Sequence, residues 1–367
     1  MASAQKDFSK GSVVGNIMGM AIPMTAAQLI NLLYNVVDRI YIGYIPEHAT
    51  LSLTGLGVCL PVITAVMAFA NLFGMGGAPL CSIERGRGNQ KEAEAIMGNS
   101  FTLMVICGIL LTILGIVFRR PLVYLFGASD STYPYAESYM TIYLLGSVFV
   151  MMGLGMNAFI NSQGFGRIGM QTVLLGAVAN IILDPVFIFG FRMDVRGAAL
   201  ATIISQFLSA AWVLRFLFSD RSILRLKRET MVLKKARVLK IVSMGMSSFA
   251  AGFTNSVVAV ACNATLQTWG GDLYVGVMTV IHSVREIAEN LVKGLTGGSQ
   301  PVLGYNFGAG QYDRVKKAIR FLSVSTIAFT TFCWILISIF PETFIHIFNR
   351  DETLVQAAIP AVRVYFF

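Results

Sequence analysis

Five residues in three apolar segments could together bind a cation or hold a proton. Asn180 and Asp184 are four residues apart, as are Ala198 and Thr202, and Asp38 lies in a separate segment near the N-terminus. Residues four apart share one face of a helix. Carboxylate, amide and hydroxyl oxygens suit a hard cation or a proton and are poor ligands for zinc or copper. The residue types therefore predict an oxygen-rich coupling site for sodium or a proton.

The expected depth of these groups strengthens the prediction. Asp38, Asp184 and Thr202 each lie about five or six residues from the predicted outer end of their segment, roughly 8 Å below the membrane boundary. A charged acid near the centre of a span costs roughly 2.5–3.5 kcal/mol, so its presence indicates function. Two nearby carboxylates repel each other, and the pair could hold one proton. The structural alternative is that Asp38 pairs with Arg39 and Asp184 only hydrogen-bonds Thr202.

Two prolines accompany these groups. Pro185 directly follows Asp184, and a proline inside a helix leaves the carbonyl one turn earlier without its N–H partner. Pro23 lies in the first apolar segment and is a candidate hinge, although a proline tolerated near a helix end would look the same.

Other polar residues in apolar segments are candidates for lining a substrate cavity. Gln28, Asn31 and Asn35 are spaced to share the helix face of Asp38. A later segment carries a run of charges in which Arg285–Glu289 and Glu289–Lys293 are i,i+4 pairs that could neutralise one another. Structural support or gating is one interpretation of that run, and direct contact with substrate is the other. The cavity candidates in this run are His282, Arg285, Glu286 and Glu289.

The composition predicts the elements that must position these groups. The chain has 367 residues, of which 55% are hydrophobic and 13% charged. Apolar runs of about 20 residues recur along it, which is typical of an all-α polytopic membrane protein. The runs are continuous rather than alternating, which argues against a β-barrel. The expected spans are 14–43, 52–80, 97–118, 136–158, 168–190, 197–218, 239–265, 273–300 and 318–340, with a tenth beginning near 353.

The basic residues indicate the orientation. The net charge is +9, but the cations gather in alternate loops, as the positive-inside rule predicts for a cytoplasmic N-terminus. No basic stripe interleaved with aromatics is present, so nucleic acid is not an expected partner. We expect a multi-pass protein of the cell membrane. The cations assigned to inner loops include Lys6, Lys10, Arg85, Arg87, Lys91, Arg167, Arg314, Lys316, Lys317, Arg320 and the nine of 215–240.

An internal repeat predicts two similar halves. The stretch "GGAPLCSIERGRGN" (76–89) aligns with "GSQPVLGYNFGAGQ" (298–311). Several matches at one offset argue for duplication. Six spans per half would place the copies in the same orientation, as two six-helix lobes related by a parallel pseudo-two-fold axis. We expect an N-terminal lobe at 1–218, a cytoplasmic linker at 219–238 and an incomplete C-terminal lobe at 239–367, with the last two to three helices missing from this chain.

Several enzyme classes are disfavoured. The sequence contains no GxxxxGK[ST] nucleotide-binding motif and no DDxxD motif of the kind that binds a metal diphosphate. Its five cysteines form no CxxC pair and are interpreted as reduced apolar residues. We predict no enzymatic activity and no cofactor other than a coupling ion.

Four stretches resemble one transporter family. "NVVDRIYIG", "NIILDP", "GAALAT" and "SQPVLGYNFGAG" are similar to segments of the multidrug and toxic compound extrusion (MATE) family, in its DinF-like prokaryotic branch. The resemblance implies a MATE-type fold of two six-helix lobes around a cavity. It also implies a sodium or proton site at Asp38, Asn180, Asp184, Thr202 and the backbone of Ala198. A cavity tyrosine matches Tyr139, and Pro23 matches a proline linked to helix bending.

The predicted function is a secondary antiporter. It would export cationic amphiphilic drugs or toxic organic compounds in exchange for sodium ions or protons by alternating access, as a monomer in the bilayer. The alternative is a flippase of the same superfamily for lipid-linked oligosaccharide or lipid. That function would be expected to place more cations in the cavity than the mixed charges found here.

Overall fold

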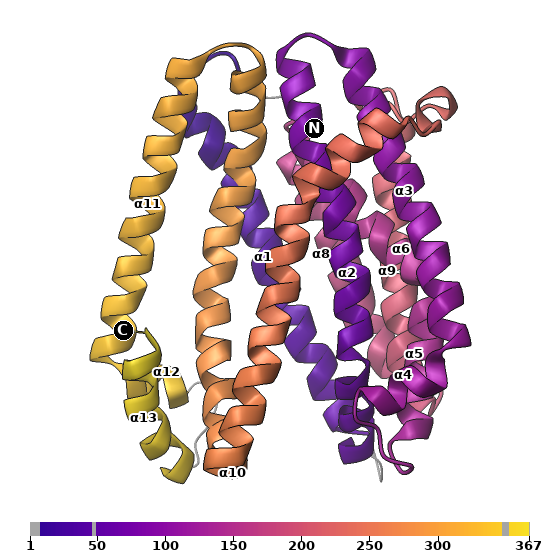
Figure 1. Ribbon diagram of the computed structural model, residues 1–367, viewed down its shortest axis with the longest axis vertical. Helices are drawn as coiled ribbons and strands as arrows, with labels where there is room; N and C mark the ends of the chain where they lie inside the picture. The colour runs from indigo at the N-terminus through magenta and orange to yellow at the C-terminus, as the bar shows by residue number, and fades with distance from the viewer. Residues whose placement is uncertain (1–7, 46–48, 347–351, 367) are drawn as a thin grey trace.

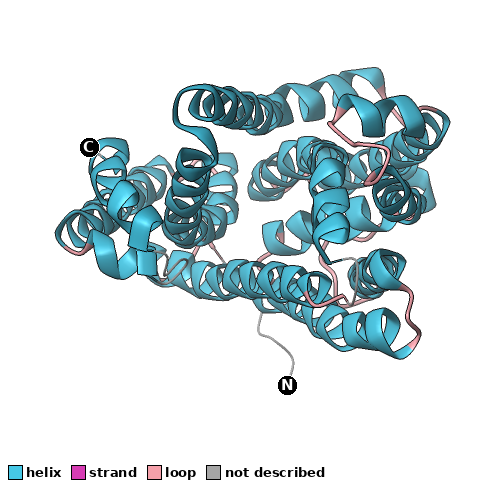
Figure 2. Ribbon diagram, turned by 90° about the horizontal axis from the view of Figure 1, so that it is seen from below, coloured by secondary structure: helices cyan, strands magenta, loops and turns pink. Residues whose placement is uncertain are grey.

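The computed structural model describes residues 8–45, 49–346 and 352–366, and within these ranges it contains helices and no strand (Figures 1 and 2). The longer helices are α1 (Val13–Gly43), α2 (Ala49–Gly86), α3 (Gln90–Val117), α5 (Tyr133–Leu145), α8 (Gly166–Pro185), α9 (Asp194–Phe218), α10 (Lys235–Gly308), α11 (Tyr312–Ile339) and α13 (Glu352–Phe366). The shorter ones are α4 (Arg119–Leu125), α6 (Ser147–Met151), η1 (Met152–Met156), α7 (Asn157–Ser162), η2 (Val186–Gly190), η3 (Arg228–Met231) and α12 (Pro341–His346). Lys6 lies outside the described residues, and so does the side chain of Arg39.

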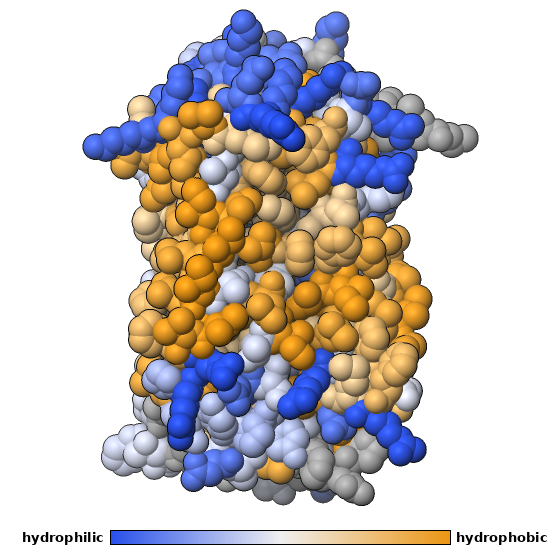
Figure 3. All heavy atoms as spheres, turned by 90° about the vertical axis from the view of Figure 1, so that its right-hand side faces the viewer, coloured by the Kyte–Doolittle hydropathy of each residue, from blue (hydrophilic) through white to orange (hydrophobic). Residues whose placement is uncertain are grey.

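The molecule has the surface of a membrane protein. Six described helices are long and apolar enough to cross a bilayer, or seven if the bent pair 133–145 and 147–162 is counted as one span. Each arm of α10 also exceeds the roughly 20 residues that a bilayer core requires. Figure 3 shows an apolar band on one face of the molecule between two hydrophilic ends. We call the end that carries residues 219–234 the linker end; it is at the top of Figure 1.

The predicted spans correspond to helices, with two local differences. The expected span 136–158 is bent by 59° where α5 ends at Leu145 and α6 begins at Ser147. At Gly146 the side chain of Ile203 occupies the space that a β-carbon would need, and glycine is a common site of sharp kinks. The same span contains the π-helical stretch η1. A second π-helix, η2, follows Pro185, whose missing N–H interrupts the regular ladder.

Two expected spans are joined in α10. This element runs without interruption from Lys235 to Gly308 except at Gly271, whose φ of 64° and ψ of −164° reverse the chain between two antiparallel arms. That backbone conformation is open to glycine and strained for other residues. The arms match the predicted spans 239–265 and 273–300.

The buried side chains form separate clusters in the two halves of the sequence. The largest cluster runs from Ile42 to Ile241, and a second one contains only residues between Val277 and Val362. A third joins the start of α1, at Ile17 and Met20, to Val302 of α10 and Ala318 of α11. α1 thus begins against second-half helices and runs obliquely toward first-half helices at the opposite end (Figure 1).

Glycines allow α1 to cross closely over α10. A β-carbon at Gly294 would overlap Thr25, and one at Gly298 would overlap the backbone of Ala21. Small residues four apart are a common device for close helix contact in membranes. Buried Pro23 lies between these two contact points, so the candidate hinge is located at the crossing.

The sequence repeat reappears as a reciprocal contact between α2 and α10. A β-carbon at Gly86 would meet the carbonyl oxygen of Tyr305 and, at 2.8 Å, the amide nitrogen of Ala309. A β-carbon at Gly308 would meet the carbonyl oxygen of Ile83. Gly308 and Tyr305 follow Gly86 and Ile83 by the same interval, 222 residues. Contacts related in this way also occur at two-fold interfaces. We call it the glycine contact.

Candidate functional site

The structure brings the two predicted acids together. Asp38 of α1 and Asp184 of α8 lie within hydrogen-bonding reach of each other. The Asp184 side chain has no exposed surface, and its Oδ1 accepts a hydrogen bond of 3.2 Å from Nδ2 of Asn180, one turn earlier. Two adjacent acids cannot both be ionised comfortably in such a place, because like charges repel more strongly when water is excluded.

Hydroxyl groups from two further helices lie around the acids. The hydroxyl of Tyr139, on α5, is hydrogen-bonded to Thr202, on α9. Tyr34 lies one turn before Asp38 on α1, close to both acids. Within the described part of the chain, no hydrogen bond joins Thr202 to Asp184, so the structural alternative for that pair is not what the structure shows. Ala198 is fully buried on α9 one turn before Thr202.

Within the described residues, two buried oxygens beside the Asp38–Asp184 contact accept no hydrogen bond from an amide or hydroxyl group. They are Oδ2 of Asp184 and Oδ1 of Asn180, and both side chains are buried, with Asn180 only 2% exposed. A buried polar atom without a partner costs about 1–3 kcal/mol, and more if it is charged. Such oxygens would be satisfied by a small cation or, at the carboxyl, by a proton. Among the described residues no three His, Cys, Asp or Glu side chains cluster, so a cation here would depend on two carboxylates and neutral oxygens.

A small cavity adjoins this group. It has a volume of about 80 Å³ and is lined by Tyr34, Asn180 and Thr202, together with Asn31 and Ser205. Its location gives water-sized species a place beside the acids. Its polar lining consists of neutral amide and hydroxyl groups.

A larger cavity of about 200 Å³ lies between the two halves of the sequence. Pro79 of α2 and Pro301 of α10 both line it, and these prolines occupy equivalent positions in the repeat. None of its described lining residues is charged. The lining contains methionines and amides, a combination that can adapt to ligands of varied shape. The amide side chains are Gln28, Asn31, Asn71, Asn157, Asn161 and Gln300.

The remaining cavity candidates are placed differently. Gln28 lines the larger cavity and Asn31 lines both, as their shared helix face predicts. Asn35 is exposed and donates to the carbonyl of Asn31 at 2.8 Å, so it lines neither. Tyr139 is buried behind Thr202 rather than lining a cavity, and it stacks on Tyr143 with ring centroids 6.2 Å apart.

The charged run of α10 forms a network with the last helix. Glu289 pairs with Arg285 at 3.0 Å and with Lys293 at 3.3 Å, as the i,i+4 spacing predicts. Arg285 also donates to the hydroxyl of Tyr365 at 2.6 Å, and the His282 ring packs edge-on against that tyrosine. Glu286 is exposed. None of these residues lines either described cavity, which favours the structural interpretation of the run.

Glu289 should therefore matter for stability more than its neighbour Glu286. Replacing it by glutamine leaves Arg285 and Lys293 without their shared anion. We expect Glu289→Gln to destabilise the protein by about 0.5–1 kcal/mol, the range of partly exposed ion pairs. The measurement is thermal unfolding of the purified protein. Glu286→Gln removes the same charge from a residue that forms no ion pair within the described part of the chain, so it should leave the unfolding temperature unchanged. Equal effects of the two changes would contradict the assignment.

Sequence reasoning missed several polar residues of the site. Tyr34 precedes Asp38 by four residues, so the helix spacing already placed it on the right face. Asn157 and Asn161 are also four apart, and their buried Oδ1 atoms accept no hydrogen bond from the residues that the structure describes. Their signal was hidden because the span that contains them is bent and partly π-helical, which breaks the simple periodicity.

Comparison with known proteins agrees with this architecture. The family model MatE matches residues 23–186 and 247–367. The chain is 25% identical over 351 residues to the multidrug export protein MepA of Staphylococcus haemolyticus, covering 96% of the chain and 77% of that protein.

Solved structures show the same fold. An outward-facing multidrug resistance MATE family transporter of the MOP superfamily superposes with a TM-score of 0.89 at 21% identity, over 97% of this chain and 79% of that one. A MOP superfamily transporter from Pyrococcus furiosus, described as having a binding pocket of reverse polarity, gives 0.89 at 21%, over 98% and 80%. The matched family model covers most of the chain. This protein is therefore a member of the MATE family of multi-pass membrane transporters and is not an enzyme.

Proposed function

We propose that this protein exports cationic or neutral amphiphilic compounds in exchange for sodium ions or protons. The observation that carries the proposal is the buried contact between Asp38 and Asp184, beside which Asn180 donates a hydrogen bond to Asp184. Oxygens of Asn180 and Thr202, which line the adjoining cavity, and of the Ala198 backbone would complete the site. An ion or a proton bound there neutralises the pair. Relatives named as multidrug export proteins support the substrate class.

Coupling would follow from competition for the same negative charge. When the acids are ionised, the nearby cavities favour an organic cation. When sodium or a proton occupies the acids, that attraction is lost and the drug leaves. Only a difference in affinity between two states can drive such exchange.

The cavity lining favours this function over a flippase for lipid-linked pyrophosphates. A doubly charged phosphate group is normally bound by arginine or lysine. The described lining of both cavities contains amides, hydroxyls and methionines and no basic residue. The flippase therefore stays the alternative, without an observation in its favour.

Alternating access would proceed by rocking of two lobes, at residues 1–218 and 239–367. The reciprocal glycine contact supports the pseudo-two-fold arrangement and would close the linker end in the present conformation. Pro23, at the crossing of α1 and α10, is the proposed hinge. The N-terminus and the linker end would face the cytoplasm, in keeping with the basic loops found there.

The second lobe would be completed by further helices. In the most apolar 18-residue stretch of α11, only 6% of the residues are buried. In the other five unbent helices that could span a bilayer, the corresponding share is 22–44%. Helices that complete the repeat would cover this surface. The DinF-like branch is also part of the proposal, because the predicted span 239–265 contains no acid and the acids proposed for ion coupling lie in the first lobe.

The direct test is efflux of ethidium from cells under an imposed sodium gradient and then under an imposed pH gradient. The chain would be tested as it is, and also extended by the final segment of a MepA-like relative. We expect efflux under one of the two gradients, and the effective gradient identifies the ion. Efflux only in the extended form would support the completed second lobe. No efflux in either form, with both proteins in the membrane, would contradict the antiporter.

A further inference from the structure

Side chains of α3 hold the linker between the two halves by hydrogen bonds to the linker backbone. Nδ2 of Asn99 donates to the carbonyls of Thr230 and Val232 at 3.0 and 2.9 Å, and Oδ1 of Asn99 accepts from the amide of Lys234 at 3.0 Å. The Thr102 hydroxyl donates to the next carbonyl, that of Met231, at 2.8 Å. One amide and one hydroxyl thus hold residues 230–234 in a single position.

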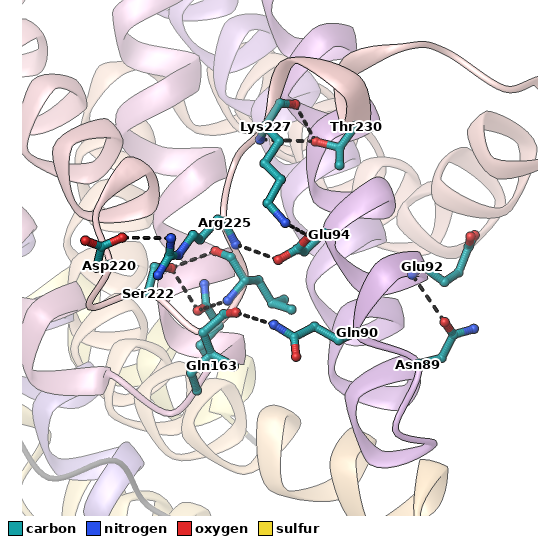
Figure 4. Close-up of polar contacts among 12 residues, drawn as sticks. Asn89, Gln90, Glu92, Glu94, Gln163, Asp220, Ser222, Arg225, Lys227 and Thr230 are labelled. Carbon is teal, nitrogen blue, oxygen red and sulfur yellow. Dashed lines mark hydrogen bonds and ion pairs between the residues drawn. The ribbon is translucent and has the colours of Figure 1, made fainter.

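The preceding part of the linker is held with its cations facing outward. Ser222, Leu224 and Leu226 are buried, whereas Arg225 and Lys227, which follow Leu224 and Leu226, are exposed. These two have acidic partners: Arg225 pairs with Asp220 at 2.7 Å, and Lys227 pairs with Glu94 at 2.8 Å (Figure 4). Their charges are therefore locally balanced.

Three other exposed cations of this region, Arg228, Lys234 and Lys235, form no ion pair within the described residues. The nearby acids are Glu229, which follows Arg228, and Glu92, which lies near Lys234 but pairs with Arg237. The three cations flank Val232 and Leu233, whose side chains are 65% and 39% exposed. Apolar side chains on a loop would normally be turned inward, but here the hydrogen bonds of the neighbouring backbone hold them outward.

The position of Val232 and Leu233 along α3 explains why apolar and basic side chains occur together here. Asn99 and Thr102 lie nine and twelve residues into α3, roughly 14 and 18 Å along the helix axis from Gln90. The exposed apolar residues of α3 begin just beyond them, at Ile106. The pair Val232–Leu233 therefore lies beside the start of the lipid-facing surface, where a membrane passes from headgroups to acyl chains.

We propose that Arg228, Lys234 and Lys235, with Val232 and Leu233, form a surface that binds the headgroups of anionic phospholipids. The cations would contact the phosphates while the two apolar side chains enter the acyl region. This combination is typical of segments that lie in the plane of an anionic membrane surface. A soluble acidic partner would account for the cations but not for the outward valine and leucine. The proposal does not depend on the antiport reaction.

The test compares unfolding temperatures in vesicles of phosphatidylcholine with and without added phosphatidylglycerol. Binding to the folded state raises the unfolding temperature. We expect wild type to gain stability with phosphatidylglycerol, and Arg228→Gln/Lys234→Gln/Lys235→Gln to lose most of that gain. Val232→Ser/Leu233→Ser should reduce it as well. Lys234→Arg/Lys235→Arg keeps the charges and should retain the gain, which separates loss of binding from a folding defect.

The matched control removes three exposed cations from the same end of the molecule. Lys316, Lys317 and Arg320 of α11 are exposed, and their replacement by glutamine should leave the gain unchanged. Equal losses in both triple variants would overturn the proposal, because net charge alone would then explain the effect. A linker triple variant that gains as much as wild type would also overturn it. The proposal would also be overturned if a polyglutamate peptide, added to wild type in phosphatidylcholine vesicles, raised the unfolding temperature as much as phosphatidylglycerol does.

Discussion

Asp184→Asn is expected to reduce gradient-driven efflux of ethidium to the level of cells without the transporter. Asparagine has nearly the same shape, and its Oδ1 can still accept the 3.2 Å hydrogen bond from Asn180. The change therefore removes the charge and leaves the local packing in place. Without that carboxylate the site can no longer exchange an ion for a drug cation. Efflux is measured by ethidium fluorescence in cells carrying whichever gradient drives wild type.

Stability separates this expectation from a simple folding defect. Removing one of two adjacent buried acids relieves their repulsion, so the unfolding temperature of Asp184→Asn should equal or exceed that of wild type. Asp130→Asn is the matched control, because Asp130 is exposed and accepts a hydrogen bond from Tyr124 that asparagine can also accept. It should transport normally. Undiminished efflux by Asp184→Asn would make Asp184 a structural residue.

Gly86→Ala and Gly308→Ala are each expected to open the linker end. An added methyl group would overlap backbone atoms across the glycine contact, and backbone cannot move aside as a flexible side chain can. Overpacking typically costs about 1–3 kcal/mol. Only the closed conformation would bear this cost, so the ratio of open to closed molecules should rise at least about fivefold. Gradient-driven efflux should fall in the same variants.

The opening can be measured by labelling a cavity cysteine. Gln300 lines the larger cavity, and Gln300→Cys would react with a membrane-impermeant maleimide added from the linker side of inside-out vesicles. Labelling of Gln300→Cys should be faster in both glycine variants. The background is the labelling of the native cysteines, measured in the protein without Gln300→Cys and subtracted. Gly57→Ala, in the same helix as Gly86, places its methyl group in open space and should not change the rate. An unchanged rate in Gly86→Ala would show that the glycine contact does not close this end.

Much of this architecture could be predicted because its signals are local. Apolar runs located the helices, and a spacing of four residues placed Asn180 and Asp184 on one face. The repeat offset matched Gly86 with Gly308 in sequence, whereas their location at one helix contact comes from the structure. Even the charges around Glu289 followed from i,i+4 spacing.

The features that were missed depend on partners distant in sequence. Asn99 holds a carbonyl 131 residues away, and nothing near Asn99 distinguishes it from any other amide in an apolar segment. Arg285 reaches Tyr365 across 80 residues. The bend in 133–162 is at Gly146, where the side chain of Ile203 fills the space that a β-carbon would need. Composition and periodicity contain no information about such pairings.

The central claim, that drug and ion compete through the Asp38–Asp184 pair, can be tested by equilibrium binding to the purified protein. The affinity for ethidium would be measured at increasing sodium concentrations and fixed pH, and then at decreasing pH in the absence of sodium. One of the two should weaken ethidium binding to wild type at least about tenfold, a coupling of about 1.4 kcal/mol. Asp184→Asn should bind ethidium weakly and show no such dependence. Ethidium affinity that is independent of both sodium and pH, or that responds equally in the variant, would contradict the account.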